Sequence, residues 1–189
     1  MRARFAVLAI GVLTAWPAAA QTVQERLPTC LACHGDRGQS QNAGVPSLGG
    51  QQEFYVTVQL LMFRERMRMA VPMNDMAKGL SDDDLQRFAG VFAKEPAPQP
   101  PAEPVDAARV ARAVALVEQN RCNSCHTANF GGQQNVPRIA DQREDYLVKA
   151  LRGYKDNSRH GYDSAMADVV APISDDQILD IAYYIARVK

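Results

Sequence analysis

The sequence predicts an all-α protein built from two tandem domains of similar structure. Three observations support this prediction. The two halves of the chain repeat the same landmarks at a nearly constant spacing, and both halves contain apolar residues at helical periodicity. Neither half shows the alternating pattern that is typical of a half-buried β-strand. We expect long loops, because the periodic segments are short and widely spaced.

The composition is typical of a globular chain and excludes several classes of protein. The 189 residues are 47% hydrophobic and 22% charged, which does not fit a disordered, collagen-like or disulfide-rich chain. Basic and acidic residues number 21 each, so the formal net charge is zero. Because binding to nucleic acid needs an excess of positive charge, the sequence predicts no nucleic-acid partner.

The first 20 residues predict a secretory signal peptide. Arg2 and Arg4 form a basic start, residues 5–13 are apolar, and residues 18–20 are three alanines that fit a cleavage site. The apolar run is far shorter than the roughly 20 residues that a membrane-spanning helix needs, so we favour cleavage over an uncleaved anchor. We therefore expect a mature chain that begins near Gln21, lies outside the cytoplasm and has no membrane span.

The repeat is clearest at the four cysteines. They lie in two copies of one pattern, Cys-x-x-Cys-His, at residues 30–34 and 122–126. We interpret the repeat as a tandem duplication, with a small loop insertion in the second half. Further pairs keep an offset of 91 to 93 residues: Val45-Pro46 with Val136-Pro137, Tyr55 with Tyr146, Phe63 with Tyr154, Arg68 with Arg159, Met73 with Met166, Ser81 with Ser174, and Phe88 with Ile181.

A proline-rich segment separates the two halves. Residues 94–104 contain five prolines, and proline at this density favours an extended, semi-rigid spacer over a helix or a central strand. We therefore expect a first domain at residues 21–93, a linker at residues 94–106 and a second domain at residues 107–189. The sequence does not decide whether the two domains pack against each other.

Capping patterns and apolar periodicity place the helices. Ser81 and Ser174 each precede an acidic first turn, as expected of N-caps, and helically spaced apolar residues follow them. A middle helix is predicted in each half, around residues 54–62 and 147–154, and a further helix around residues 110–117. Domains with so few short helices bury little apolar surface, so we expect an additional stabilising group in each.

The Cys-x-x-Cys-His motif indicates covalent attachment of haem. Two cysteines three residues apart at the start of a helix can form thioether bonds to the two vinyl groups along one porphyrin edge. The histidine that follows is then placed to bind the iron. The sequence therefore predicts two haem c groups, held by thioethers from Cys30, Cys33, Cys122 and Cys125, with His34 and His126 as iron ligands.

Other interpretations of the motif explain less of the sequence. A thioredoxin-like dithiol needs a βαβ setting, which is absent from the pattern. A structural zinc site needs four ligands, and each motif offers three. A simple disulfide leaves the adjacent histidine and the repeated downstream methionine unexplained.

A methionine is predicted as the second axial ligand in each domain. Met166 is the only methionine of the second half, and the repeat selects Met73 as its counterpart. The neighbouring Met67, Met69 and Met76 are interpreted as core residues. Because a thioether ligand raises the reduction potential and a six-coordinate iron has no open position for a substrate, this ligand set favours electron transfer over catalysis.

Two prolines are candidates to orient the histidine ligands. Pro46 and Pro137 follow the two histidines by 12 and 11 residues. A proline carbonyl at this position could accept the Nδ1–H of the ligand and fix its tautomer. The alternative is that both are ordinary loop prolines.

On these residues the chain resembles tandem class I c-type cytochromes, most closely the dihaem cytochrome c4 family of bacterial periplasmic electron carriers. The resemblance covers nearly all of residues 27–189. It rests on residues 30–35, residues 45–51, Tyr55, Gln59-Leu60, and Met73 with residues 80–84. It implies two pairs of iron ligands, His34 with Met73 and His126 with Met166. It also implies one-electron transfer between a membrane quinol-oxidising complex and a terminal oxidase or reductase.

Three functions remain open at this point. A diffusible two-haem carrier is favoured, and a dedicated cytochrome subunit of a larger oxidoreductase is the alternative. An enzyme, such as a dihaem peroxidase or a thiosulfate-oxidising cytochrome, would need one displaceable iron ligand. His160 is the only histidine outside the motifs and could compete for the second iron, although an exposed position is the simpler interpretation.

Basic residues recur around the predicted middle helices of both halves. They could form a rim that steers docking of redox partners, or they could contact the haem propionates. A solvated helix face is the simpler interpretation. The residues are Arg64, Arg66, Arg68, Arg152, Lys155 and Arg159.

Overall fold

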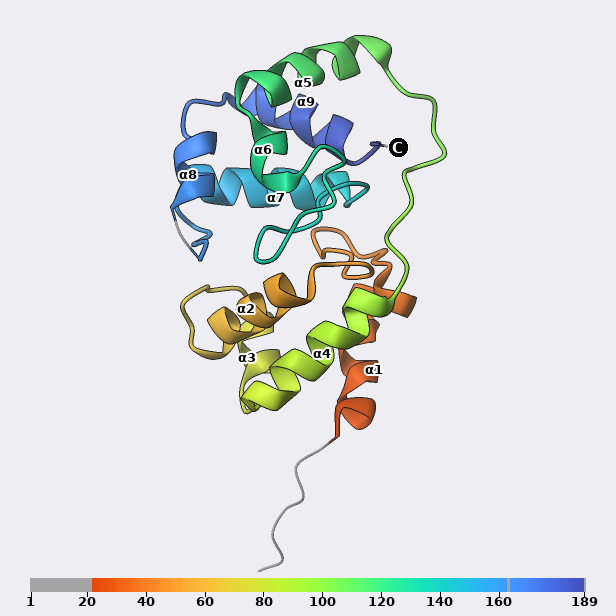
Figure 1. Ribbon diagram of the computed structural model, residues 1–189, viewed down its shortest axis with the longest axis vertical. Coiled ribbons are helices and arrows are strands. Elements are labelled where there is room, and N and C mark those ends of the chain that lie inside the picture. Colours follow the sequence, from red (N-terminus) through yellow and green to blue (C-terminus); the bar gives the residue numbers. More distant parts are fainter. Residues whose placement is uncertain (1–21, 163, 189) are drawn as a thin grey trace, which may run out of the picture.

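The computed structural model describes residues 22–162 and 164–188, which fold into two groups of helices joined by an extended segment (Figure 1). Apart from one isolated bridge between Gln133 and Val136, these residues form helices, turns and loops. The all-α prediction is therefore confirmed. The predicted signal peptide lies outside the described residues.

The order of helices in the first group is repeated in the second. The first group contains α1 (Val23–His34), the short 3-10 helix η1 (Asp36–Gly38), α2 (Glu53–Arg64), α3 (Met73–Ala77) and α4 (Asp82–Lys94). The second contains α5 (Ala107–Gln119), α6 (Cys122–His126), α7 (Glu144–Lys155), α8 (Ala165–Val170) and α9 (Asp175–Ile185). Helix α2 packs against α4, and α7 packs against α9, so equivalent helices meet in both groups.

The last long helix of each group begins at a serine N-cap, as the sequence predicts. The Ser81 side chain accepts a hydrogen bond from the N–H of Asp84, whose carboxylate accepts from the N–H of Ser81 in return. Ser174 and Gln177 form the same capping box at α9. These contacts satisfy N–H groups of the first turn that have no partner within the helix.

Each group of helices surrounds its own apolar core. The buried residues of the first core are Val23, Phe63, Ala77, Leu80, Leu85 and Phe88. Those of the second core are Val117, Phe130, Ala140, Leu147, Val170, Ile173, Ile178, Ile181, Ala182, Ile185 and Ala186. The first cysteine of each motif, Cys30 or Cys122, packs against the core of its own group, so each motif lies beside a separate apolar interior.

The segment between the two groups is extended. Residues 95–106 leave the end of α4 near the junction and run along the side of the second group to the start of α5 (Figure 1). The Gln39 side chain donates a hydrogen bond to the carbonyl of Pro96 (2.6 Å), and Arg37 forms an ion pair with Glu95 (3.2 Å). These contacts fix the start of the segment on the first group.

The two groups pack against each other through their loops. Residues 35–52 of the first group face residues 127–143 of the second (Figure 1), and several hydrogen bonds cross the junction between them. The sequence leaves this contact undecided. These hydrogen bonds join the two halves, each of which contains one cysteine motif.

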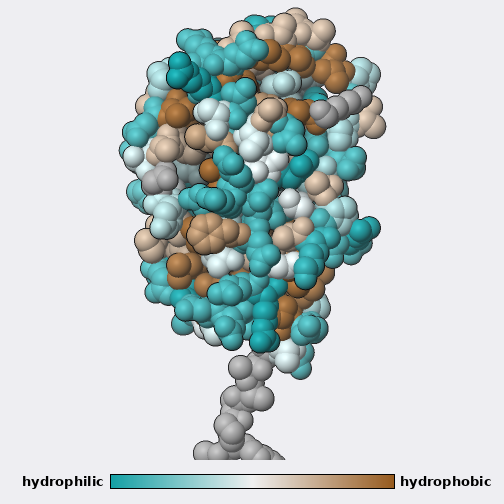
Figure 2. All heavy atoms as spheres, viewed as in Figure 1, coloured by the Kyte–Doolittle hydropathy of each residue, from teal (hydrophilic) through white to brown (hydrophobic). Residues whose placement is uncertain are grey.

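The outer surface is mixed in character. Hydrophilic and hydrophobic residues are interspersed over both groups on the face shown in Figure 2. None of the helices in the described ranges combines the length and the apolarity that crossing a membrane requires.

Candidate functional site

The two cysteine motifs have the same pattern of exposure although they lie on different helices. Cys30 and Cys33 lie in the last part of the long helix α1, whereas Cys122 and Cys125 lie in the short helix α6. In each motif the first cysteine is half-buried and the second is exposed. Burial raises the pKa of the Cys30 and Cys122 thiols.

All four thiols are free, which does not support the disulfide interpretation. Among the described residues no group of three or more histidine, cysteine, aspartate or glutamate side chains is arranged to hold a metal ion. The zinc interpretation therefore has no support in the structure either.

The two histidines of the motifs are buried and equally oriented. His34 and His126 are each 6% exposed. The Nδ1 atom of His34 lies 2.8 Å from the carbonyl oxygen of Pro46, and that of His126 lies 3.0 Å from the carbonyl oxygen of Pro137. A carbonyl oxygen can only accept, so Nδ1 carries the proton in both rings and Nε2 keeps its lone pair for a metal. Burial lowers the pKa of both histidines, and this effect exceeds the opposing effect of the two hydrogen bonds. The neutral form of each ring is therefore favoured.

The residue after each histidine has a left-handed backbone conformation. Gly35 has φ of 80°, and the equivalent Thr127 has φ of 70°. A Cβ on Gly35 would lie 2.1 Å from the carbonyl oxygen of Gln39, so this position tolerates only glycine. This turn directs the chain away from the ring and towards the loop that contains the proline.

The two methionines selected by the repeat lie at equivalent places. Met73 is the first residue of α3 and packs against the first core, and Met166 lies in α8 and packs against the second core. The interpretation of Met67, Met69 and Met76 as core residues is wrong, because their exposed fractions are 58%, 56% and 41%. Met67 and Met69 lie in the segment between α2 and α3, and Met76 lies in α3 on a side that no other described residue buries.

Two of the six basic residues are withdrawn from solvent, in contrast to the solvated helix face considered from the sequence: Arg68 is buried and Arg159 is half-buried. Arg68 is 8% exposed, and its guanidinium lies 4.6 Å from the centre of the Phe63 ring and donates a hydrogen bond to Gln59. Arg159 donates to the hydroxyl of Tyr146 (3.0 Å) and, across the junction, to the hydroxyl of Tyr55 (3.2 Å).

Within the part of the chain that the structure describes, these two guanidinium groups have no anionic partner. No ion pair within residues 22–162 and 164–188 involves Arg68 or Arg159, and the Nε of Arg159 is buried without a hydrogen-bond partner. Burial opposes ionisation of Tyr146, yet the charges of Arg159 and Arg68 lower its pKa to about 7. Because a buried charge is costly without a counter-charge, the region fits a group that brings carboxylates with it.

The other basic residues that were considered as a docking rim lie at or near the surface. Arg64 pairs with Asp82 (2.8 Å), and Arg152 pairs with Asp175 (2.5 Å). Lys155 donates to two loop carbonyls, and Arg66 is largely exposed. His160 is exposed, as the simpler interpretation expected.

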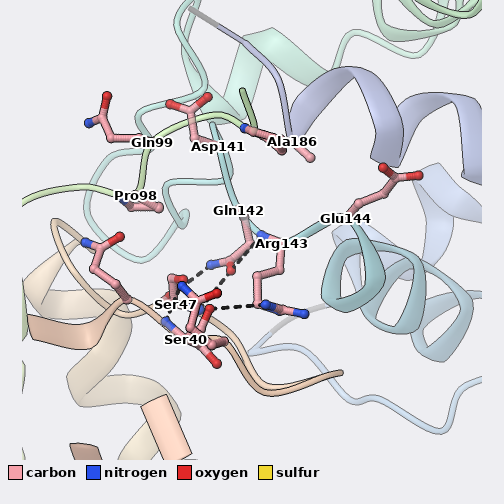
Figure 3. A pocket seen from close by; sticks show the side chains of 12 residues that line it. Ser40, Ser47, Pro98, Gln99, Asp141, Gln142, Arg143, Glu144 and Ala186 are labelled. Carbon is pink, nitrogen blue, oxygen red and sulfur yellow. Dashed lines mark hydrogen bonds between the residues drawn. The ribbon is translucent and has the colours of Figure 1, made fainter. Parts of the chain in front are cut away.

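The sequence gives no role to two glutamines that the structure places at the junction. Gln51 and Gln142 are buried and reach across to the opposite loop. They keep the 91-residue offset of the repeat, and each follows its loop proline by five residues. That shared position is the signal that could have identified them. A polar pocket at the junction is lined in part by Gln142, Arg143 and Ser47 (Figure 3), and none of the predicted iron ligands lines it.

Comparison with known proteins gives a consistent picture. A family model described as cytochrome c matches residues 110–189. The chain is 28% identical over 173 residues to cytochrome c4 of Pseudomonas aeruginosa, covering 86% of this chain and 85% of that protein. It is 30% identical over 169 residues to a thiosulfate dehydrogenase electron acceptor of Stutzerimonas stutzeri, covering 84% and 78%. The crystal structure of reduced recombinant cytochrome c4 from Pseudomonas stutzeri matches with a TM-score of 0.79 at 26% identity, covering 88% of this chain and 97% of that one.

Proposed function

The chain belongs to the cytochrome c4 family of c-type cytochromes, and from this premise we propose that it transfers single electrons between periplasmic redox partners through two haem c groups, one in each half. The observation that carries the proposal is the duplicated site. Each half has a Cys-x-x-Cys-His motif with a buried histidine whose Nδ1 is held by a loop carbonyl.

The residues of each half suit one covalently attached haem. We propose thioethers from Cys30 and Cys33 with His34 and Met73 on the iron in the first half, and thioethers from Cys122 and Cys125 with His126 and Met166 in the second. When bound, haem supplies reversible exchange of one electron between the ferrous and ferric states of its iron.

The protein residues have three tasks around this group. Pro46 and Pro137 hold the Nδ1 proton, which leaves Nε2 of each histidine as the donor to iron. The apolar cores would exclude water from a bound haem, which would disfavour the extra positive charge of ferric iron. The buried Arg68 and the half-buried Arg159 would supply positive charge for propionate carboxylates.

We propose the domain limits and the location on the same basis. The first domain spans residues 21–93, the linker residues 94–106 and the second domain residues 107–189. The start of α5 at Ala107 supports these limits, and α4 ends at Lys94, one residue into the proposed linker. The signal peptide at residues 1–20 would deliver the mature chain to the periplasm.

The central test is the number and ligation of the haem groups. The protein matured in a periplasmic expression system is expected to have the mass of the processed chain plus two haem groups, and a redox titration is expected to show two one-electron steps. A single haem per chain, or rapid binding of carbon monoxide by the reduced protein at neutral pH, contradicts the proposal, because a six-coordinate iron leaves no open position.

A second function is favoured by one of the relatives. The relative from Stutzerimonas stutzeri is a thiosulfate dehydrogenase electron acceptor, so this chain could receive electrons from such an enzyme rather than from a quinol-oxidising complex. The two functions separate in a reduction assay. Oxidised protein is mixed with thiosulfate alone, with thiosulfate and a thiosulfate dehydrogenase, or with a quinol and a quinol-oxidising complex. Reduction by thiosulfate alone would indicate an enzyme, and the faster of the other two reactions identifies the donor.

A further inference from the structure

Two buried glutamines form a reciprocal set of hydrogen bonds across the junction. The Gln142 amide donates to the carbonyl of Ser47 (2.9 Å) and accepts from its N–H (2.9 Å) (Figure 3). The Gln51 amide donates to the carbonyl of Arg138 (2.9 Å) and accepts from its N–H (2.7 Å). Because Ser47 and Arg138 are equivalent in the repeat, the two interactions are related by an approximate two-fold axis.

The peptide group that Gln142 contacts is the one that orients the histidine of the first half. The carbonyl of Pro46 and the N–H of Ser47 belong to a single peptide group. Its oxygen accepts from Nδ1 of His34, and its N–H donates to Oε1 of Gln142. The second half therefore holds one end of the peptide whose other end holds His34.

The same relation exists in the opposite direction. The peptide between Pro137 and Arg138 accepts from Nδ1 of His126 at its oxygen and donates to Oε1 of Gln51 at its N–H. Each half thus contributes one glutamine to the histidine-bound peptide of the other half.

The orientation of both amides is determined by their surroundings. Oε1 of Gln142 also accepts from the N–H of Arg143 (3.0 Å), and Oε1 of Gln51 also accepts from the N–H of Gln52 (3.0 Å). An oxygen is required where two N–H groups converge, so the amides cannot be reversed without losing both bonds. Gln51 and Gln142 are 6% and 5% exposed, so water has little access to replace them.

A hydrogen bond at the N–H of a peptide strengthens its carbonyl as an acceptor, because the two groups polarise each other through the same amide. A stronger acceptor draws the Nδ1 proton of the histidine and makes the ring more electron-rich. An electron-rich ligand stabilises the more positive state of a bound metal. The glutamines can therefore affect the iron ligands without touching them.

We propose that Gln51 and Gln142 are positioning residues that act crosswise, each tuning the reduction potential of the iron bound in the opposite half. The inference depends on the proposed function, since it requires a haem in each half. It also makes the docking of the two halves part of each electron-transfer site, because separating the halves would release both peptide N–H groups to water.

The test uses the full-length protein with both haems attached, as wild type and as the Gln142→Leu and Gln51→Leu variants. Leucine keeps most of the side-chain volume and removes the amide. The potentials of the two haems are measured by spectroelectrochemistry. Exchange of the histidine Nδ1 protons is measured by nitrogen-15 NMR in the diamagnetic ferrous state, which assigns each effect to His34 or His126.

Gln142→Leu is expected to raise the potential of the haem ligated by His34 and to speed exchange of the His34 Nδ1 proton about fivefold, as loss of support from a typical hydrogen bond would. The His126 values are expected to remain at those of wild type. Gln51→Leu is expected to give the mirror-image result. A shift in the same half as the substitution, an equal shift in both halves, or no shift overturns the proposal.

A neighbouring glutamine supplies the matched control. Gln52 also donates across the junction, to the carbonyls of Gly131 (2.8 Å) and Gly132 (3.3 Å), but it contacts neither histidine-bound peptide. Gln52→Leu is expected to weaken docking while leaving both potentials unchanged. If it shifts them like the other two variants, general loosening of the junction explains the effect and the proposal fails.

A milder variant covers the case in which a leucine prevents folding. Gln142→Asn keeps the amide but is one methylene shorter. We therefore expect a smaller shift of the reduction potential in the same direction, confined to the haem ligated by His34. No shift, or a shift at the haem ligated by His126, overturns the proposal. Haem content measured on the same samples separates the two levels of the hypothesis. Fewer than two haems per chain in the wild type contradicts the proposed function, whereas two haems without a crosswise shift contradict this inference alone.

Discussion

The two halves of the chain reach the same site geometry by different routes. In the first half the cysteine motif is the end of one continuous helix, α1. In the second half the equivalent segment is broken at Arg121, whose φ of 52° separates α5 from the five-residue helix α6. The two histidines are nevertheless equally buried and bonded to equivalent prolines. The site therefore depends on the turn and the loop after the motif rather than on the helix before it.

The largest effect is expected from replacing the methionine ligand of one half at a time. Met73→Ala and Met166→Ala are each expected to abolish the weak sulfur-to-ferric-iron absorption of one haem, about half of the total, because each methionine serves only its own half. Optical spectra of the oxidised variants measure this loss. Met76→Ala is the control, since Met76 is an exposed neighbour in α3. An unchanged spectrum in Met166→Ala contradicts that ligand assignment.

A change at the turn after the histidine tests whether the two halves can exchange residues. Gly35→Thr copies the second half into the first, where the added Cβ would lie 2.1 Å from the Gln39 carbonyl oxygen. We expect a loss of more than ~3 kcal/mol in the free energy of unfolding, or failure of haem attachment in the first half. Denaturant unfolding and haem content measure the effect, and wild-type stability would show that this turn is not a constraint.

The second half has a charged clamp between its first and last long helices. Asp180 on α9 accepts from Arg112 (2.7 Å) and Arg109 (3.0 Å) on α5. The hydrogen bond from Arg112 lowers the pKa of Asp180, with a further contribution from Arg109. A folded-state pKa below the unfolded value means that the stabilisation is present above about pH 4 and is lost as the pH falls through the folded-state pKa.

Asp180→Asn is therefore expected to cost about 1 kcal/mol of unfolding free energy at pH 7, and the difference from wild type is expected to shrink towards zero near pH 2. Urea unfolding at both pH values, followed by a probe of the second half, measures this. A difference that is independent of pH would mean that packing, rather than charge, is responsible.

The smallest effect is expected from placing the glycine of the first half at the equivalent position of the second half, Thr127. Thr127 has a left-handed backbone that is unfavourable for a β-branched residue. Thr127→Gly is expected to relieve this strain. Because glycine also has greater conformational entropy in the unfolded chain, the net gain in the free energy of unfolding is expected to be less than about 1 kcal/mol. Thermal unfolding of the holoprotein measures the gain, and a clear loss of stability would show that the Thr127 side chain has a role of its own.

The elements predicted well from sequence are those with local causes. The starts of α4 and α9 follow from serine caps and acidic first turns, and the helical class follows from apolar periodicity. The family also follows, since its motif residues are contiguous in the chain. These features depend on contacts within a few residues of one another, which a single sequence displays directly.

Features that depend on the opposite half could not be predicted. Arg159 lies in a polar stretch that suggested exposure, but Tyr55 of the first half reaches its guanidinium. Met67 and Met69 are apolar and suggested burial, but they are more than half exposed among the residues that the structure describes. Docking of the halves decides which side chains lose contact with water, and a periodic pattern in one half contains no information about that surface.

The reciprocal glutamines have a consequence for the history and assembly of the chain. In a contact between two identical molecules related by a two-fold axis, residue i touches residue j while j touches i, and the junction here has that form. Such a surface is close to self-complementary, because each half supplies both a glutamine and the peptide group that the other half's glutamine binds. The proline-rich tether raises the local concentration of each half around the other, which favours the docked arrangement over separated halves.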